Sequence, residues 1–176
     1  EIYLKTVVVP DTKPKNQYLL CPIGLVGAGK TTVIKPLAKA LGLVRISGDE
    51  MRKLFHDRNV GYERVKELGF EIMVGFLEKG YSVAIDSDCI AKDSQKNIQT
   101  LKTQFNLTDV WVHINPPEEF ILNKLQNLSP NWLGTAEGMV INYFWRKPLH
   151  QKIGFPFVYT FDTSRDNVSE QIAEAA

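Results

Sequence analysis

The feature that most constrains the fold is a glycine-rich turn between an apolar run and an amphipathic stretch. The run Tyr18–Ile23 leads into Gly24–Thr31, which fits the pattern G-x-x-x-x-G-K-[ST] without a mismatch. Glycines let the backbone wrap closely around an anion and point its N–H groups inward. A helix that begins near Lys30 directs the positive end of its dipole at the same anion. The sequence therefore predicts a strand, a phosphate-binding loop and a helix in succession.

This loop predicts which residues bind a nucleoside triphosphate, and we expect the ligand to be ATP with Mg²⁺. Lys30 is expected to reach the β- and γ-phosphates, and the Thr31 hydroxyl to bind the metal ion. The other predicted nucleotide contacts come from the loop itself: Gly24, Val26, Gly27, Ala28, Gly29 and Thr32. A chance glycine turn is the alternative. It is disfavoured because the strand, the helix and an additional middle glycine all stand in place.

The rest of the chain alternates short apolar runs with amphipathic stretches, which is typical of an α/β fold. We predict three layers: a central, mostly parallel sheet of about five strands with helices on both faces. The expected strands after the first are Val44–Ser47, Tyr81–Asp86, Val110–Ile114 and Phe157–Phe161. Residues 18–176 are expected to form this domain, with a lid near 129–146. Residues 1–17 form a predicted extension in which Tyr3–Val9 has strand-like composition.

Composition and charge argue against several classes of partner and site. Hydrophobic residues make up 44% and charged residues 23% of the chain, as in an ordinary globular protein. The net charge of +1 argues against an extended nucleic-acid footprint. No apolar run approaches the length of about 20 residues that spans a membrane, so we expect no membrane partner. Cys21 and Cys89 are too few for a disulfide framework and lack zinc spacing, which favours a cytoplasmic location.

A carboxylate and a guanidinium follow the second predicted strand, at Asp49 and Arg52. In an open α/β sheet, ligands sit beyond the carboxyl ends of the strands, so Asp49 is expected on the phosphate-loop side. Arg52, three residues further on a helical turn, shares its face. Together they suit a base and an acceptor clamp for phosphate transfer to a hydroxyl. The alternative is that Asp49 caps the first turn of the helix, and both roles can coexist.

The order of these features resembles a known family. The loop Gly24–Thr32, the D-x-x-R run Asp49–Arg52 and the third strand ending in Asp86 look like the polynucleotide-kinase-like branch of small P-loop kinases. That branch includes phage-type 5′-hydroxyl polynucleotide kinases and zeta-toxin-like kinases. The resemblance implies the P-loop kinase fold, a general base at Asp49 and an acceptor-phosphate contact at Arg52. It also implies that Asp86 holds a metal-bound water or positions Arg52, and that Thr163 and Ser164 border the nucleotide.

The lid departs from this family, whose members usually carry arginines there. Residues 127–144 contain no Arg or Lys, and the nearest candidates are Arg146, Lys147 and Lys124. We predict Arg146 as the catalytic cation, with a solvated helix end as the alternative. An arginine in this position is worth several powers of ten in rate. Its absence would instead favour a non-catalytic or slowly hydrolysing ATP-binding regulatory module.

The leading hypothesis is an ATP-dependent kinase that transfers the γ-phosphate to a hydroxyl acceptor. The candidate acceptors are a polynucleotide 5′-hydroxyl, a nucleotide or a small metabolite, so an oligonucleotide end is among the expected partners. A place near the shikimate or gluconate kinases is less favoured, because the chain lacks the aspartate pair and the glycine triplet that are usual in the shikimate kinases. The histidines His56, His113 and His150 lack metal-ligand spacing, and structural or exposed roles are expected for them.

Overall fold

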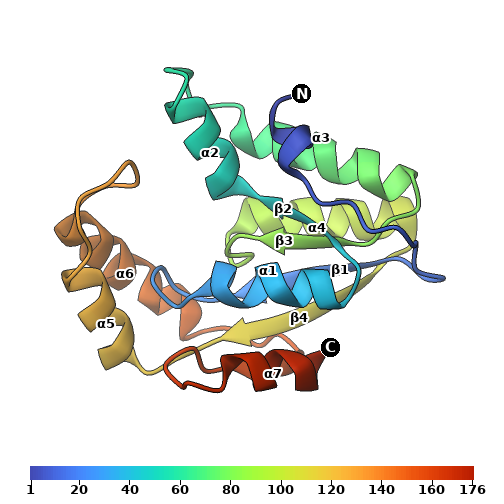
Figure 1. Ribbon diagram of the computed structural model, residues 1–176. Helices are drawn as coiled ribbons and strands as arrows, with labels where there is room; N and C mark the ends of the chain where they lie inside the picture. The colour runs from blue at the N-terminus through green and yellow to red at the C-terminus, as the bar shows by residue number, and fades with distance from the viewer.

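The sheet has five parallel strands in the order β2-β3-β1-β4-β5, in a computed structural model that describes all 176 residues. The strands are β1 Tyr18–Ile23, β2 Val44–Ser47, β3 Val83–Asp86, β4 Thr108–Ile114 and β5 Phe157–Phe161. Each neighbouring pair runs parallel, with one irregularity between Trp111 and Val112 of β4. The predicted three-layer α/β fold is confirmed (Figure 1).

Helices cover both faces of the sheet (Figure 1). Helices α1 (Lys30–Ala40) and α7 (Val168–Ala175) pack together on one face, and α3 (Val65–Glu78) and α4 (Lys92–Phe105) on the other. The short α2 (Gly48–His56) follows β2, whereas α5 (Glu118–Gln126) and α6 (Ala136–His150) stand together beyond the end of β4. None of these helices combines the length and hydropathy needed to cross a bilayer.

Strand β1 is buried on both faces, which explains its nearly continuous apolar sequence. Leu19, Cys21 and Ile23 join the core under α3 and α4, whereas Leu20 joins the core under α1 and α7. β1 pairs with β3 on one side and with β4 on the other. The chain therefore leaves β1 at the point where the strand order reverses, which is where ligands bind in open α/β sheets.

The N-terminal segment forms no strand. Tyr3–Thr6 is a single 3₁₀ turn (η1), although Tyr3–Val9 has strand-like composition. The segment docks by side chains instead of ladder hydrogen bonds: the buried Tyr3 hydroxyl accepts from the Ser47 N–H at 2.8 Å. Gln17 donates its amide to two carbonyls, those of Leu77 and Tyr81, both at 2.8 Å. A domain boundary after Gln17 stays a prediction.

The predicted lid consists of a turn and a helix. The turn closes with a bridge between Asn131 and Gly134, and α6 continues past Arg146 to His150. Glu118 of α5 holds the helix: it accepts a hydrogen bond from the Tyr143 hydroxyl at 3.0 Å and pairs with Lys147. Residues 143 and 147 share one face of α6. Asn142 and Arg146, each one position earlier, line the cavity that Lys30 also lines.

Candidate active site

The phosphate loop adopts the conformation that its glycines permit. Gly27 and Gly29 have φ angles of 82° and 89°, in the left-handed region that glycine enters without steric cost. The Lys30 ammonium lies inside the loop, where it donates to the carbonyls of Gly24 at 2.8 Å and Leu25 at 2.9 Å. Burial lowers the pKa of Lys30, and the carboxylates of Asp88 and Asp49 oppose that effect. The loop is thus folded around the ammonium group of Lys30.

Thr31 and Asp86 meet behind the loop. The Thr31 hydroxyl donates to the Asp86 carboxylate at 3.0 Å, and this carboxylate also pairs with Arg45 of β2. Burial raises the pKa of Asp86 and the Arg45 guanidinium counters it. Two hard oxygen donors suit Mg²⁺, which usually takes one or two protein ligands and completes its shell with phosphates and water. The described chain holds no cluster of three or more acidic, His or Cys side chains that could bind a metal ion without substrate.

The expectation that Asp86 positions Arg52 is wrong. In the parallel pair of β2 and β3, Ser47 lies opposite Asp86. Arg45, two residues earlier on β2, has its side chain on the same face and therefore reaches the carboxylate. Arg52 lies beyond the strand, on α2, and pairs with Asp49.

Asp49 and Arg52 both come from α2 and form an ion pair. The helix is capped by Ser47, whose hydroxyl accepts from the Glu50 N–H at 3.4 Å. The alternative role of Asp49 as the cap is therefore wrong, since that position belongs to the residue two places earlier. The Asp49 side chain is 56% exposed, so a ligand can reach its carboxylate.

Asp88 connects the phosphate loop to the lid helix, a role that sequence reasoning missed. Its carboxylate accepts from the Gly24 N–H at 3.4 Å and binds Arg146 at 3.1 Å and His150 at 3.0 Å. Burial alone would raise the pKa of Asp88, but the hydrogen bond and charge of His150, with Lys30, bring it below its usual range. A structural or exposed role was expected for His150. The available signals were a second acid after Asp86 and the Arg146–His150 spacing of one helical turn.

The segment after β5 lies against the loop. The Thr163 hydroxyl donates to the Ala28 carbonyl at 2.7 Å, and a Cβ on Gly29 would come within 3.1 Å of the Thr163 side chain. Ser164 turns the other way, since both its N–H and its hydroxyl donate to Asp162. Of the two residues predicted to border the nucleotide, Thr163 therefore contacts the phosphate loop.

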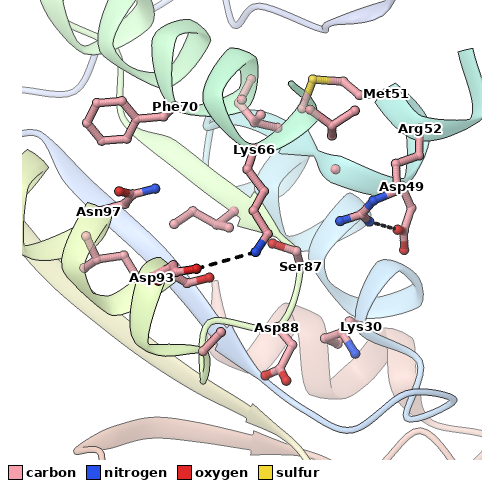
Figure 2. Close-up of a pocket in the computed structure, with 18 of the residues that line it drawn as sticks. Lys30, Asp49, Met51, Arg52, Lys66, Phe70, Ser87, Asp88, Asp93 and Asn97 are labelled. Atoms are coloured by element: carbon pink, nitrogen blue, oxygen red, sulfur yellow. Dashed lines mark hydrogen bonds and ion pairs between the residues drawn. The ribbon is translucent and has the colours of Figure 1, made fainter. Parts of the chain in front are cut away.

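One cavity of about 460 Å³ collects the predicted catalytic side chains. Figure 2 shows Lys30, Asp49 and Arg52 around it, together with Asp88. Val26 and Arg146 line the same cavity, whereas Thr31, Asp86, Thr163 and Ser164 lie outside its lining. The cavity thus extends from Lys30 of the phosphate loop to Asp49 and Arg52 of α2. Arg146 of α6 lies along the same cavity.

A phosphate loop at the reversal point of a parallel sheet, with an acidic residue of α2 in the same cavity as its lysine, defines the P-loop kinase fold. A family model described as an AAA domain matches residues 19–129, and the chain belongs to this family. No protein of curated function matches the chain in sequence.

Solved structures share this architecture along most of their length. A putative kinase from Chloroflexus aurantiacus has a TM-score of 0.63 at 15% identity, covering 90% of this chain and 93% of that chain. Shikimate kinase from Acinetobacter baumannii in complex with shikimate has 0.51 at 18%, covering 90% of each chain. APS kinase from Mycobacterium tuberculosis in complex with AMPPNP and APS has 0.51 at 14%, covering 92% and 96%. Such identities show the fold alone, and the polynucleotide-kinase-like branch stays a prediction.

Proposed function

We propose that the protein is an ATP-dependent kinase that transfers the γ-phosphate to a hydroxyl acceptor, with Asp49 as the general base. The observation that supports this proposal is that Lys30 and Asp49 line one cavity. A nucleotide held by the loop and an acceptor beside α2 would therefore meet in the same space. ATP is the donor, and Thr31 with Asp86 would hold Mg²⁺, which neutralises charge on the phosphates.

The chemistry follows from the positions of these side chains. Asp49 accepts the proton of the acceptor hydroxyl, whose oxygen forms a bond to the γ-phosphorus. The bond from that phosphorus to the β,γ-bridging oxygen breaks, and ADP leaves. Arg52 pairs with Asp49 and orients its carboxylate toward the acceptor. Lys30 and Arg146 supply positive charge where the moving phosphoryl group carries its negative charge.

Arg146 supplies the cation that the turn of the lid lacks. It lies on α6, next to the phosphate loop, and Asp88 holds its guanidinium at 3.1 Å. The turn and first three helical turns bring no Arg or Lys of their own. The kinase proposal therefore requires this one arginine to act in transfer. A regulatory module that binds ATP without transfer is the alternative outcome of the experiment below.

The test uses γ-labelled ATP with a panel of hydroxyl acceptors, and compares the wild type with Asp49→Asn. We expect the variant to lose about 10² to 10⁴ in transfer rate, because it lacks the proton acceptor. ATP affinity, measured by isothermal titration, should change much less, since the hydrogen-bond partner of Asp49 is Arg52 and not the loop. The matched control is Asp57→Asn, at the exposed end of the same helix, where Asp57 pairs only with Lys53 and His56.

Transfer by Asp49→Asn at the wild-type rate would refute the assigned base. Tight ATP binding by the wild type with no labelled product from any acceptor would instead favour the regulatory module.

A further inference from the structure

The acceptor half of the cavity has an apolar floor. It is built by side chains of α2, α3 and α4: Met51, Val65, Phe70, Met73 and Ile98. All except the half-buried Phe70 are less than 10% exposed. Figure 2 shows Met51 and Phe70 across the cavity from Lys30. Such a floor stabilises a ligand by removing apolar ligand surface from water, and it offers little to a ligand made only of hydroxyl groups.

The charges of this cavity are already paired. Arg52 pairs with Asp49, Lys66 lies 3.7 Å from Asp93, and Arg146 lies 3.1 Å from Asp88. The first two pairs are drawn in Figure 2. Of the four cations in the lining, only Lys30 has no carboxylate partner, and it belongs to the phosphate loop. A phosphate or carboxylate on the acceptor would therefore have to break an existing ion pair.

The remaining polar groups are neutral. Ser87, Ser94, Asn97 and Asn142 offer hydroxyl and amide groups that can donate to or accept from a ligand's uncharged heteroatoms. These groups favour a ligand with several hydrogen-bonding atoms and no net charge.

Trp145 stands at the mouth of the cavity. It belongs to α6, next to Arg146, lines the cavity, and is 73% exposed. An indole is a favourable stacking surface for a flat ring, and base–aromatic stacking changes affinity by about tenfold or more. Trp145 can thus bind the acceptor by stacking if the acceptor carries a flat ring.

We propose that the acceptor is an uncharged alcohol with a flat, weakly polar ring, the class that contains nucleosides and aryl glycosides. The ring would lie between the apolar floor and Trp145, and the hydroxyl would face Asp49. A cavity of about 460 Å³ is in the range of small-molecule sites, which run from about 300 to 1,000 Å³. This inference rests on the proposed kinase function and narrows its acceptor.

The experiment compares matched acceptors with γ-labelled ATP. Uridine, thymidine and phenyl β-riboside carry the ring, methyl β-riboside lacks it, and uridine 3′-monophosphate adds charge. A short oligonucleotide with a 5′-hydroxyl tests the polymer. We expect the ring-bearing neutral alcohols to exceed the methyl riboside in kcat/KM by about tenfold or more. Equal or better transfer to the methyl riboside, the monophosphate or the oligonucleotide would overturn the proposed class.

Variants locate the ring. Trp145→Ala should raise KM for the ring-bearing acceptors by about tenfold, leaving the ATP dissociation constant and transfer to the methyl riboside unchanged. Phe70→Leu should raise the same KM by a smaller factor. Phe144→Ala is the control, because Phe144 is the exposed neighbour on α6 that does not line the cavity. An unchanged KM in Trp145→Ala would remove this residue from the site and contradict the ring-stacking proposal.

A binding experiment distinguishes a wrong kinase proposal from a wrong ligand class. If no acceptor is phosphorylated, the kinase proposal fails, and the same compounds are titrated in the presence of AMPPNP while tryptophan fluorescence is followed. Saturable quenching by ring-bearing alcohols alone, lost in Trp145→Ala, would keep the ligand class. No quenching, or equal binding of the charged compound, would overturn it.

Discussion

The two walls of the cavity are built in different ways. The phosphate wall comes from one contiguous segment, Gly24–Lys30, of which Val26 and Lys30 line the cavity, and in the proposed kinase it binds through backbone groups and one lysine. The acceptor wall comes from side chains of α2, α3, α4 and α6, which are far apart in the sequence. Backbone amides recognise a phosphate in any chain that folds this loop, whereas side chains from four helices recognise one kind of acceptor. The difference separates the shared chemistry from the specificity of this chain.

The walls also differ in how firmly they are held. The loop is tied to its surroundings by Thr163 at Ala28 and by Asp88 at Gly24. On the acceptor wall, the side chains of Lys66 and Asp93 are 72% and 81% exposed, so their ion pair adds little to the stability of the fold. We therefore expect variants of the loop to affect nucleotide binding, and variants of the acceptor wall to affect transfer.

The largest expected effect tests whether the lid helix belongs to the reaction. Arg146→Ala should lower kcat by about 10³ or more, because an arginine that stabilises the moving phosphoryl group is worth that much. ATP affinity should change much less, since the loop is intact. Arg146→Lys should recover part of the rate. The control is Arg165→Ala, where an exposed arginine pairs only with Asp162. A full rate in Arg146→Ala would break the comparison, because the lid helix would then take no part in the reaction.

The next effect tests the loop wall with two glycines of like conformation. Gly29 and Gly42 have φ angles of 89° and 63°, so alanine is strained at both by about 1–2 kcal/mol. A Cβ on Gly29 would also press on Thr163, whereas one on Gly42 would meet nothing within 4 Å. Gly29→Ala should weaken ATP binding by about tenfold or more, because the loop amides must shift.

Gly42→Ala should lower the free energy of unfolding, measured in urea, by the same backbone strain of about 1–2 kcal/mol and leave the ATP affinity unchanged. Equal ATP affinity in the two variants would mean that the loop adapts without cost, and that the phosphate wall is as adjustable as the acceptor wall.

The sequence predicts the phosphate wall well because that wall is local. Strand, loop and helix follow one another within Tyr18–Ala40, so motif and periodicity describe them together. The cap of α2 was also local, yet the sequence left it open: Ser47 and Asp49 are both favourable capping residues, and only the backbone position of the first turn decides between them.

Contacts between distant elements explain what the sequence did not predict. Arg45 reaches Asp86 because β2 pairs with β3, and strand order cannot be read from either strand alone. Asp88 and His150 are 62 residues apart and meet only when α6 docks beside the loop. Tyr3 lies among β-favouring residues, but it forms no strand, and a buried hydrogen bond from the Ser47 N–H to its hydroxyl holds it in place.

The smallest expected effect concerns the carboxylates of Asp86, behind the phosphate loop, and Asp88, between the loop and the lid helix. Burial raises the pKa of Asp86 despite Arg45, so ionising it costs stability as the pH rises above its unfolded pKa of about 3.9. The pKa of Asp88 is lowered, because His150 and Lys30 outweigh the burial of its carboxylate. Its contribution is therefore full above pH about 3.9 and is lost as the pH falls through the folded-state pKa.

The two asparagine variants should consequently change with pH in opposite directions. The loss of unfolding free energy in Asp88→Asn, relative to the wild type, should grow as the pH rises from about 2.5 to 5. The loss in Asp86→Asn should shrink as the pH rises above about 3.9, because the wild type then bears the cost of ionising a buried acid. Urea unfolding at four pH values measures both. Parallel slopes would mean that the two carboxylates have the same electrostatic surroundings, and that Asp88 does not join the phosphate loop to the lid helix.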